Sequence, residues 1–178
     1  MEVAKAIKER RSIRRFKRKE IPREITMRVL EAIRWAPSWA NTQCWEVIIV
    51  QDEEKRRALG DTLPPKNPAR SAFEEAPLVV VFVAKREVSG YYKGAPVTDK
   101  GDWYMFDVAL AVQNLCLSAH NEGLGTVIVG YFDASRVARL LEVEDDRSVV
   151  AMVPMGYPEE VPQAPPRKEI EEFVRWVR

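Results

Sequence analysis

The amino-acid sequence predicts an α+β fold: a three-layer α/β/α sandwich in which helices cover both faces of a central mixed sheet. Strand-like and helix-like segments alternate along the chain, and the helical segments are numerous enough to cover two faces of one sheet. The run LVVVFVA at residues 78–84 is continuously apolar and rich in β-branched residues, which is typical of a central strand buried on both sides. The 178 residues fit one domain over 1–178, with no repeat or low-complexity linker to divide it.

Individual elements follow from apolar spacing and from the residues that end a helix. The predicted helices are 2–10, the stretch between Pro22 and Pro37 with Ile25, Val29, Leu30 and Ile33 on its apolar face, 53–59 ended by Gly60, 103–122 capped by Asp102 and ended by Gly123, a helix from Asp133 to about Glu142, and a final helix carrying Ile170, Phe173, Val174 and Val177. The predicted strands are 46–51, 78–84, 126–131 and 149–155, and the stretches 61–70 and 86–101 are predicted to be long loops.

Composition excludes several classes of function. The formal net charge is +1, which gives no general electrostatic attraction to nucleic acid or to an anionic membrane. The chain has one histidine and no CxxC spacing, so we expect no metal site, and two cysteines are too few for a disulfide framework. No apolar run approaches the ~20 residues that span a bilayer, and the first residues lack a signal-peptide pattern. We therefore expect a soluble cytoplasmic protein.

A basic segment near the start is the first candidate for a binding site. Residues 5–19 contain nine basic residues and one acidic residue, and RRSIRRF at 10–16 places guanidinium groups beside a hydroxyl and a predicted helix end. Arginine donates hydrogen bonds in a planar fork that matches phosphate oxygens, so this pattern fits a polyanion site. A solvated basic face is the alternative, and a nucleic-acid patch is disfavoured by the near-neutral total charge.

A second candidate lies between a predicted helix and the strand 46–51. The stretch APSWANTQCW at 36–45 presents several amides and hydroxyls between two tryptophans. Stacking surface combined with hydrogen-bonding groups suits a planar heteroaromatic ligand. The alternative is a loop whose tryptophans fill the core, and for Trp45, at the strand entrance, we favour that alternative.

These two segments resemble the two best-known motifs of the nitroreductase family of FMN enzymes in spacing and order. GLGTVIVGYFD at 123–133 is similar to the third family segment, and VPMGYP at 153–158 followed by PRK at 166–168 is similar to the fourth. Four motifs in the same order are far more specific than any one of them. The resemblance covers nearly the whole chain and implies the nitroreductase-like, FMN-dependent fold.

The resemblance also implies a role for individual residues. Arg10 and Ser12 would contact the phosphate and ribityl end of FMN with Arg11 nearby, and Arg14 would lie near the pyrimidine edge of the flavin. A fixed cation at that edge would stabilise the negative charge of the reduced ring. Further residues are implied as cofactor-binding: from the other subunit Pro37, Ser38, Trp39 and Asn41 with Gln43 supporting, the backbone amides of Val129 and Gly130 near the flavin N5, and Arg167 with Lys168 at the phosphate.

Two positions depart from the family pattern: many members carry Glu where Val129 stands and Pro where Cys44 stands. Both departures bear on reactivity rather than on FMN binding. The loop 61–70 is short for the family, so Lys66 and Asn67 receive no role. No histidine is near Cys44 in sequence, so we expect no catalytic thiolate there. Cys116 is expected in the core, and His120 is expected to cap a helix or face solvent.

The resemblance implies an enzyme in which NADH or NADPH reduces FMN by a ping-pong mechanism and an electron-poor small molecule reoxidises it. Nitroaromatics, quinones, free flavin and oxygen are candidate acceptors, and no side chain is expected to act as a catalytic acid or base. It also implies a homodimer with FMN at the interface. The alternatives are another flavin chemistry on the same fold, such as reductive dehalogenation or flavin fragmentation, a non-catalytic flavin- or nucleotide-binding module, and a basic nucleic-acid binder.

Overall fold

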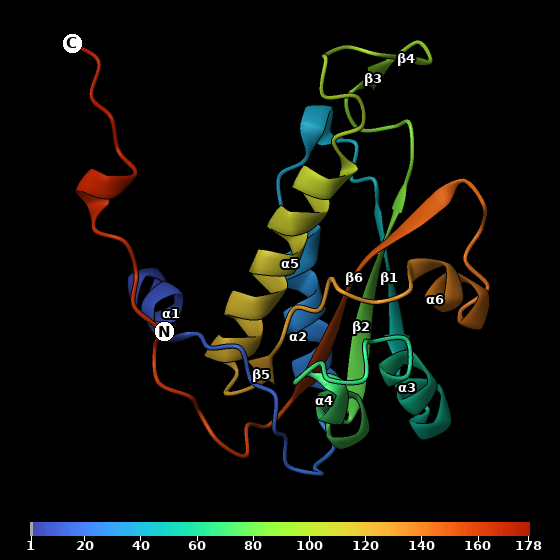
Figure 1. Ribbon diagram of the computed structural model, residues 1–178, viewed down its shortest axis with the longest axis vertical. Coiled ribbons are helices and arrows are strands. Elements are labelled where there is room, and N and C mark those ends of the chain that lie inside the picture. The colour runs from blue at the N-terminus through green and yellow to red at the C-terminus, as the bar shows by residue number, and fades with distance from the viewer. Residues whose placement is uncertain (1) are drawn as a thin grey trace.

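The computed structural model describes residues 2–178, and its centre is a four-stranded sheet (Figure 1). The strand order is β1-β2-β6-β5. The strands are β1 (Trp45–Val50), β2 (Leu78–Lys85), β5 (Gly125–Thr126) and β6 (Arg147–Gly156). All three pairings are antiparallel. The mixed sheet predicted from the sequence is therefore antiparallel within its four strands, and the parallel contact is a single bridge between Ser12 and Thr126.

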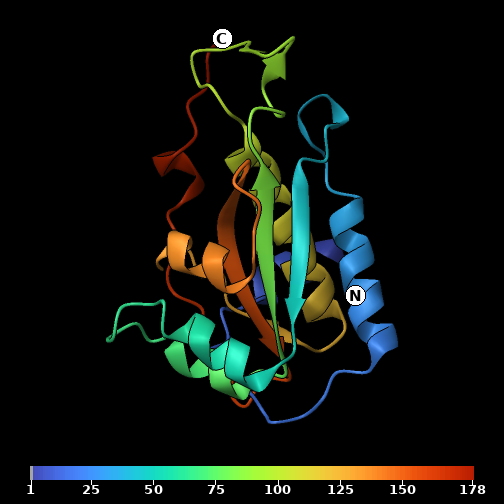
Figure 2. The ribbon, with the colours of Figure 1, turned by 90° about the vertical axis from the view of Figure 1, so that its right-hand side faces the viewer.

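Strand β2 separates two hydrophobic cores. Its residues from Leu78 to Ala84 are all buried, as the continuous apolar run predicts. Leu78, Val80 and Phe82 pack on one face with α2 (Arg23–Arg34) and α5 (Tyr104–Asn121). Val79, Val81 and Val83 belong to the core on the other face, which the helices α3 (Glu53–Gly60), α4 (Arg70–Glu75) and α6 (Ala134–Leu140) cover (Figure 2). The predicted three-layer arrangement is confirmed.

Most of the predicted helices are present with nearly the expected bounds. The first predicted helix is α1 (Val3–Glu9), and the second, third, fourth and fifth correspond to α2, α3, α5 and α6. The Asp133 side chain caps α6 by accepting a hydrogen bond from the Arg136 N–H at 2.9 Å. Asp102 accepts one from the Tyr104 N–H at 3.1 Å, and Gly123 ends α5 with a positive φ of 77°. No helix among residues 2–178 has the combined length and apolar character needed to cross a membrane.

The structure differs from the prediction where a short element depends on its neighbours. Helix α4 begins at the last residue of the predicted loop 61–70 and continues where no element was predicted, and the hairpin of β3 (Tyr91–Tyr92) with β4 (Ala95–Pro96) lies within the predicted loop 86–101. The strand predicted at 126–131 is reduced to β5 and one bridge between Val129 and Met152. Gly60 is the last residue of α3 rather than a left-handed terminus. A Cβ there would lie 3.1 Å from the Cβ of Phe73, so the glycine permits close packing of α3 on α4.

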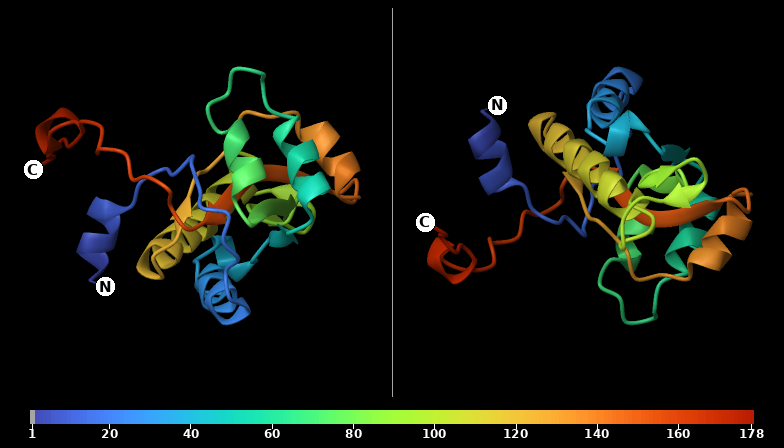
Figure 3. Two further views of the ribbon diagram at one scale, coloured as in Figure 1. Left: turned by 90° about the horizontal axis from the view of Figure 1, so that it is seen from below. Right: turned by 90° about the horizontal axis from the view of Figure 1, so that it is seen from above.

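The predicted final helix is wrong. Residues 158–178 form an extended tail that leaves the body of the protein, and they contain only the short 3₁₀ helix η2 (Ile170–Glu172) (Figure 3). The apolar side chains Phe173 and Trp176 are 66% and 81% exposed. A short amphipathic helix is marginal unless its apolar face is buried, and one chain offers this segment no surface to pack on.

The basic segment is fixed to the sheet by β5. The Ile13 N–H donates to the Thr126 carbonyl at 2.9 Å, and the Ile13 side chain is buried. Gly125 makes this approach possible, because a Cβ at that position would lie 2.5 Å from the Cγ1 of Ile13 and 2.8 Å from its Cβ. The location of residues 10–14 therefore depends on the absence of a side chain at Gly125.

We expect Gly125→Ala to destabilise the protein by about 1–3 kcal/mol, because overpacking forces the segment around Ile13 away from β5. Urea unfolding at equilibrium measures the change. Gly130→Ala is the control, since no atom lies within 4 Å of the position of its Cβ and its φ is not in the left-handed region. Equal stability of the two variants would show that Gly125 does not position the segment.

Candidate functional site

The sequence-predicted site residues form two groups at opposite ends of α5. The Trp39 N–H donates to Oδ1 of Asp107 at 3.0 Å, which places the loop 37–43 beside the first turns of α5. Arg10 and Arg11 line a pocket together with His120, in the last turn of the same helix. Positions 107 and 120 are separated by about 20 Å along a helix that rises 1.5 Å per residue. One chain therefore does not bring the two groups together.

The loop 37–43 has an unusual backbone. Ala40, Asn41 and Gln43 have positive φ values of 45°, 57° and 47°, a region that residues with a side chain seldom adopt. The Ser38 Oγ accepts a hydrogen bond from the Gln43 N–H at 2.9 Å, which closes the loop. Three left-handed residues in four positions cost free energy that the surrounding contacts must supply, and such strain is concentrated at functional sites.

The same loop presents polar groups to the outside. Pro37, Asn41 and Gln43 are exposed and line a shallow pocket of about 360 Å³ together with Trp35. The Gln43 Nε2 donates to Asn41 Oδ1 at 3.3 Å, so the two amides support one another. Trp45 is half-buried against the core of α2 and α5, as we expected for that tryptophan. The loop thus brings the exposed amides of Asn41 and Gln43 next to the Ser38 hydroxyl and the half-buried Trp39.

Asp107 holds this loop and is itself fully buried. Sequence analysis missed this residue, although an acidic side chain within the apolar helix segment YMFDVALAV is a signal that could have identified it. The neighbouring Cys44 Sγ lies 3.7 Å from Oδ2 of Asp107. Burial, followed by the charge of Asp107, raises the pKa of the Cys44 thiol to about 12. Cys44 is therefore a protonated donor and not a thiolate nucleophile, and burial likewise raises the pKa of Cys116.

At the other end of α5, Arg10 and Arg11 line a pocket of about 290 Å³. The Arg11 Nη1 donates a hydrogen bond to the Lys8 carbonyl at 2.6 Å, and this carbonyl in the last turn of α1 thereby gains a partner. Arg15 forms an ion pair with Glu75 at 2.9 Å, so part of the basic segment has a structural partner. Arg14 is exposed, and Ser12 is held at the edge of β5 by its bridge to Thr126. Among the described residues, the guanidinium groups of Arg10 and Arg14 make no hydrogen bond within the chain, in contrast to that of Arg11.

His120 contributes a further polar atom to this pocket. Within residues 2–178, its Nε2 is the one buried side-chain nitrogen or oxygen that has no hydrogen-bond partner. Burial lowers the pKa of His120, and the positive charges of Arg10 and Arg11 lower it further, while Glu9 acts in the opposite direction. The expectation that this histidine caps a helix or faces solvent is wrong for its Nε2, which is buried and caps nothing in the described part of the chain. A buried imidazole nitrogen without a partner, beside two guanidinium groups, fits an anionic ligand when the Nε2 carries the proton and can donate it.

The structure corrects the assignment of Val129 and places the remaining residues. The Val129 N–H donates to the Met152 carbonyl at 2.9 Å, so it is already used within the sheet and is not available to a ligand. Gly130 is exposed and next to it. Asn67 is used locally, because its Oδ1 accepts from the Ala69 N–H at 2.9 Å.

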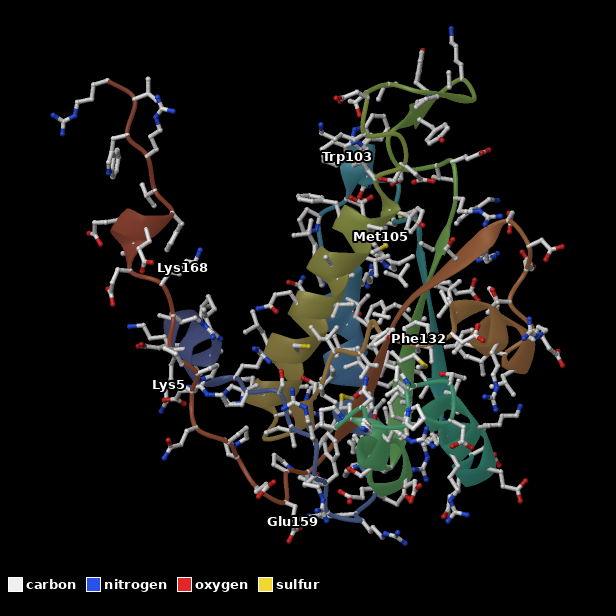
Figure 4. The ribbon with its side chains drawn as sticks, viewed as in Figure 1. Lys5, Trp103, Met105, Phe132, Glu159 and Lys168 are labelled. Atoms are coloured by element: carbon white, nitrogen blue, oxygen red, sulfur yellow. The ribbon has the colours of Figure 1, made fainter. Side chains whose placement is uncertain are left out.

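Arg167 and Lys168 belong to the extended tail 158–178, on which Figure 4 labels Lys168. The Glu159 N–H donates to the Arg15 carbonyl at 3.0 Å and fixes the start of the tail. Beyond Glu159, the hydrogen bonds of the described residues are made within the tail itself. One chain therefore does not bring Arg167 or Lys168 to the pocket of Arg10.

We expect native Cys44 to resist alkylation by iodoacetamide at about pH 8, because the reactive species is the thiolate. The pKa of Cys44 is higher in the folded state than its ordinary value of 9.0. The contribution of the protonated thiol to folding stability is therefore full below pH 9.0 and is lost as the pH rises toward about 12. Cys116→Ala isolates the signal of Cys44, and mass spectrometry follows the adduct. Rapid labelling of the folded variant, at the rate of the urea-unfolded one, would contradict the assignment.

Comparison with known proteins identifies the family of the chain. Residues 7–157 match the family described as the Nitroreductase family. The chain is 27% identical to an NADH dehydrogenase from Thermus thermophilus, over 94% of this chain and 92% of that protein. It is 29% identical to an iodotyrosine deiodinase from Thermotoga neapolitana, over 92% of each. An FMN-dependent nitroreductase from Clostridium difficile superposes with a TM-score of 0.82 at 25% identity over 99% of both chains. The chain belongs to the Nitroreductase family.

Proposed function

We propose that the protein is an FMN-dependent oxidoreductase that takes reducing equivalents from NADH or NADPH and passes them, by a ping-pong mechanism, to an electron-poor small molecule such as a nitroaromatic, a quinone or a flavin. Family membership supports an oxidoreductase, and the FMN-dependent nitroreductase and the NADH dehydrogenase among its relatives support the cofactor and the donor. The observation that carries the proposal is the division of the site residues between the two ends of α5.

The residues at the β5 end fit the phosphate of FMN. Arg10 and the unpartnered Nε2 of His120 face one pocket, and a phosphate dianion would supply the acceptor that both groups lack. Ser12 is held next to them by its bridge to Thr126. Arg14 is exposed on the same segment and would provide the cation at the pyrimidine edge of the ring.

The residues at the other end fit the flavin ring. Bound FMN would supply the redox chemistry, accepting a hydride from the nicotinamide and passing on two electrons. The chain's part is to bind and orient: Ser38 and Asn41 offer hydrogen bonds, and Pro37 and Trp39 offer flat apolar surface. No protein acid or base is required, which agrees with the protonated state of Cys44.

We propose a homodimer on the ground of the same division, because one flavin ring cannot contact groups about 20 Å apart along α5. Unpartnered apolar side chains support a second chain: Val3 on α1 is 72% exposed, Phe106 on α5 is 56% exposed, and the tail carries Phe173 and Trp176. We propose that the loop 37–43 of one chain completes the site built on Arg10 and Arg14 of its partner. The tail would bring Arg167 and Lys168 to the phosphate across the interface.

Another flavin chemistry on this fold is the second candidate, and the loop 86–103 is the feature of the structure that favours it. The loop 86–103 lies at the same end of α5 as the loop 37–43 and carries exposed Tyr92 and Lys93. Aromatic and cationic side chains on such a loop suit an aromatic substrate with an acidic group. The deiodinase relative is consistent with this reading. Turnover of a halogenated tyrosine in preference to nitroaromatics would support it over the nitroreductase reading.

We expect the purified protein to be yellow, or to become yellow on incubation with FMN, with one FMN per chain and no dependence on added metal. Visible absorption and isothermal titration measure the stoichiometry, and oxidation of NADH or NADPH coupled to nitrofurazone reduction measures the activity. A colourless protein that releases no heat with FMN would remove the whole proposal.

Replacing Arg10 with Ala should weaken FMN binding by about tenfold or more and leave riboflavin binding almost unchanged, because the lost partner is the phosphate. Quenching of flavin fluorescence measures both affinities. Arg18→Ala is the control, since it removes a neighbouring exposed cation outside the site. Equal losses for FMN and riboflavin would place Arg10 away from the phosphate.

The shared site predicts complementation between two inactive variants, Arg14→Ala and the double variant Ser38→Ala/Asn41→Ala. A mixed dimer would have one site with both defects and one with neither, so it should recover up to about half of the wild-type activity per dimer. The variants are refolded together, and mass spectrometry of differently tagged chains reports subunit exchange. No recovery despite complete exchange would place the whole pocket within one chain.

A further inference from the structure

The buried carboxyl of Asp107 joins two loops at the proposed flavin-ring end of α5. We propose that Asp107 is a positioning residue. It fixes the loop 38–44 (the loop 37–43 without Pro37 and with Cys44) against the ring and ties it to the loop 86–103. This inference rests on the proposed function, because it assigns the loop 38–44 to the flavin. Asp107 itself touches neither substrate nor cofactor in this assignment, since it is fully buried.

Both carboxyl oxygens of Asp107 are used by the two loops. Oδ1 accepts the Trp39 N–H at 3.0 Å. Oδ2 accepts the hydroxyl of Ser89 at 2.6 Å, and it lies 3.5 Å from the Thr42 Oγ1 and 3.7 Å from the Cys44 Sγ. All of these donors come from residues 38–44 and from the loop 86–103, and none comes from α5. The carboxyl therefore contributes to loop position rather than to the helix on which it lies.

Free energy explains why the carboxyl and the loop depend on each other. A buried carboxyl without donors is costly, so the loops must be in place for Asp107 to be tolerated. The loop 38–44 in turn contains three left-handed residues, and such a conformation persists when surrounding bonds determine it. The Ser38 bond to Gln43 closes the loop on itself, whereas the Trp39 bond to Asp107 attaches it to the rigid helix.

The loop 86–103 is attached at the same carboxyl. Ser89 is fully buried, and its carbonyl accepts the Trp103 N–H at 3.0 Å. Asp102 accepts the Glu87 N–H at 2.6 Å. Gly90 has a φ of 81°, and a Cβ there would lie 2.4 Å from the Cδ1 of Trp103. These contacts fix the start and the end of the loop 86–103, which carries Tyr91 and Tyr92. The Asp107 side chain therefore keeps the loop 38–44 and the loop 86–103 in fixed positions relative to each other.

Hydrogen exchange of the protein without added flavin tests the attachment directly. Asp107→Ala should speed the exchange of amides in 39–44 and 87–91 by about tenfold or more, the loss expected for hydrogen bonds to a charged group, and leave the amides of β2 unchanged. Asp107→Asn keeps one acceptor and offers an N–H to Ser89, so it should stay within about threefold of wild type. Asp52→Ala is the control, because it removes a carboxyl that accepts the Lys55 N–H at 2.8 Å, on α3.

Flavin binding by the same variants distinguishes positioning from general stability. Asp107→Ala should weaken FMN and riboflavin by the same factor, about tenfold, since the ring and not the phosphate loses its support, and it should shift the flavin midpoint potential. Asp107→Asn should restore both readouts, and Asp52→Ala should change neither.

Unchanged exchange in 39–44, or unchanged flavin affinity and potential in folded Asp107→Ala, would overturn the inference. If that variant does not fold, Ser89→Ala decides in its place: it keeps the carboxyl, removes its shortest bond, and must speed exchange in 87–91 for the inference to stand. A wild-type protein that binds no flavin would refute the proposed function, whereas the exchange data would still show whether Asp107 holds the loops.

Discussion

Burial of both faces of β2 is the constraint on which the rest of the structure depends. Its side chains alternate between two cores, so helices must cover each face of the sheet. On one face this requirement places α5 across the sheet together with α2. On the other face it places α3, α4 and α6. The loops 37–43 and 86–103 lie at one end of α5 as a result of this arrangement.

Helix α5 then acts as a rigid spacer between two sets of polar groups. Asp107, near its start, holds the loop 37–43, and His120, in its last turn, faces the pocket of Arg10 and Arg11. Because the helix is packed on the sheet along its length, neither set can move toward the other. We propose that these two sets of groups are half-sites, and the proposed dimer is the arrangement in which they would meet.

Strained and unsatisfied groups mark both half-sites. The left-handed residues Ala40, Asn41 and Gln43 lie at one end, and the unpartnered Nε2 of His120 lies at the other. In the rest of residues 2–178 the buried side-chain nitrogens and oxygens have partners, as with the buried Arg56, whose guanidinium donates to carbonyls at the end of α4. Glu87, Lys93 and Glu142 also have a positive φ, but three such residues within four positions occur, among the described residues, in the loop 37–43, where the proposed cofactor would bind.

The sequence by itself determined the layers, the two principal cores and four ordered motifs, because these depend on local apolar spacing and on residue types such as the run 78–84. It also predicted α1, α2, α5 and α6 with nearly their observed bounds. Tertiary structure decided what depends on distant partners. The predicted helix at the end of the chain is absent because its apolar face has nothing to pack on, and the Val129 amide is taken by Met152 across the sheet. Asp107 became visible as the group that joins two loops only once Trp39 and Ser89, far apart in sequence, were brought to the same carboxyl.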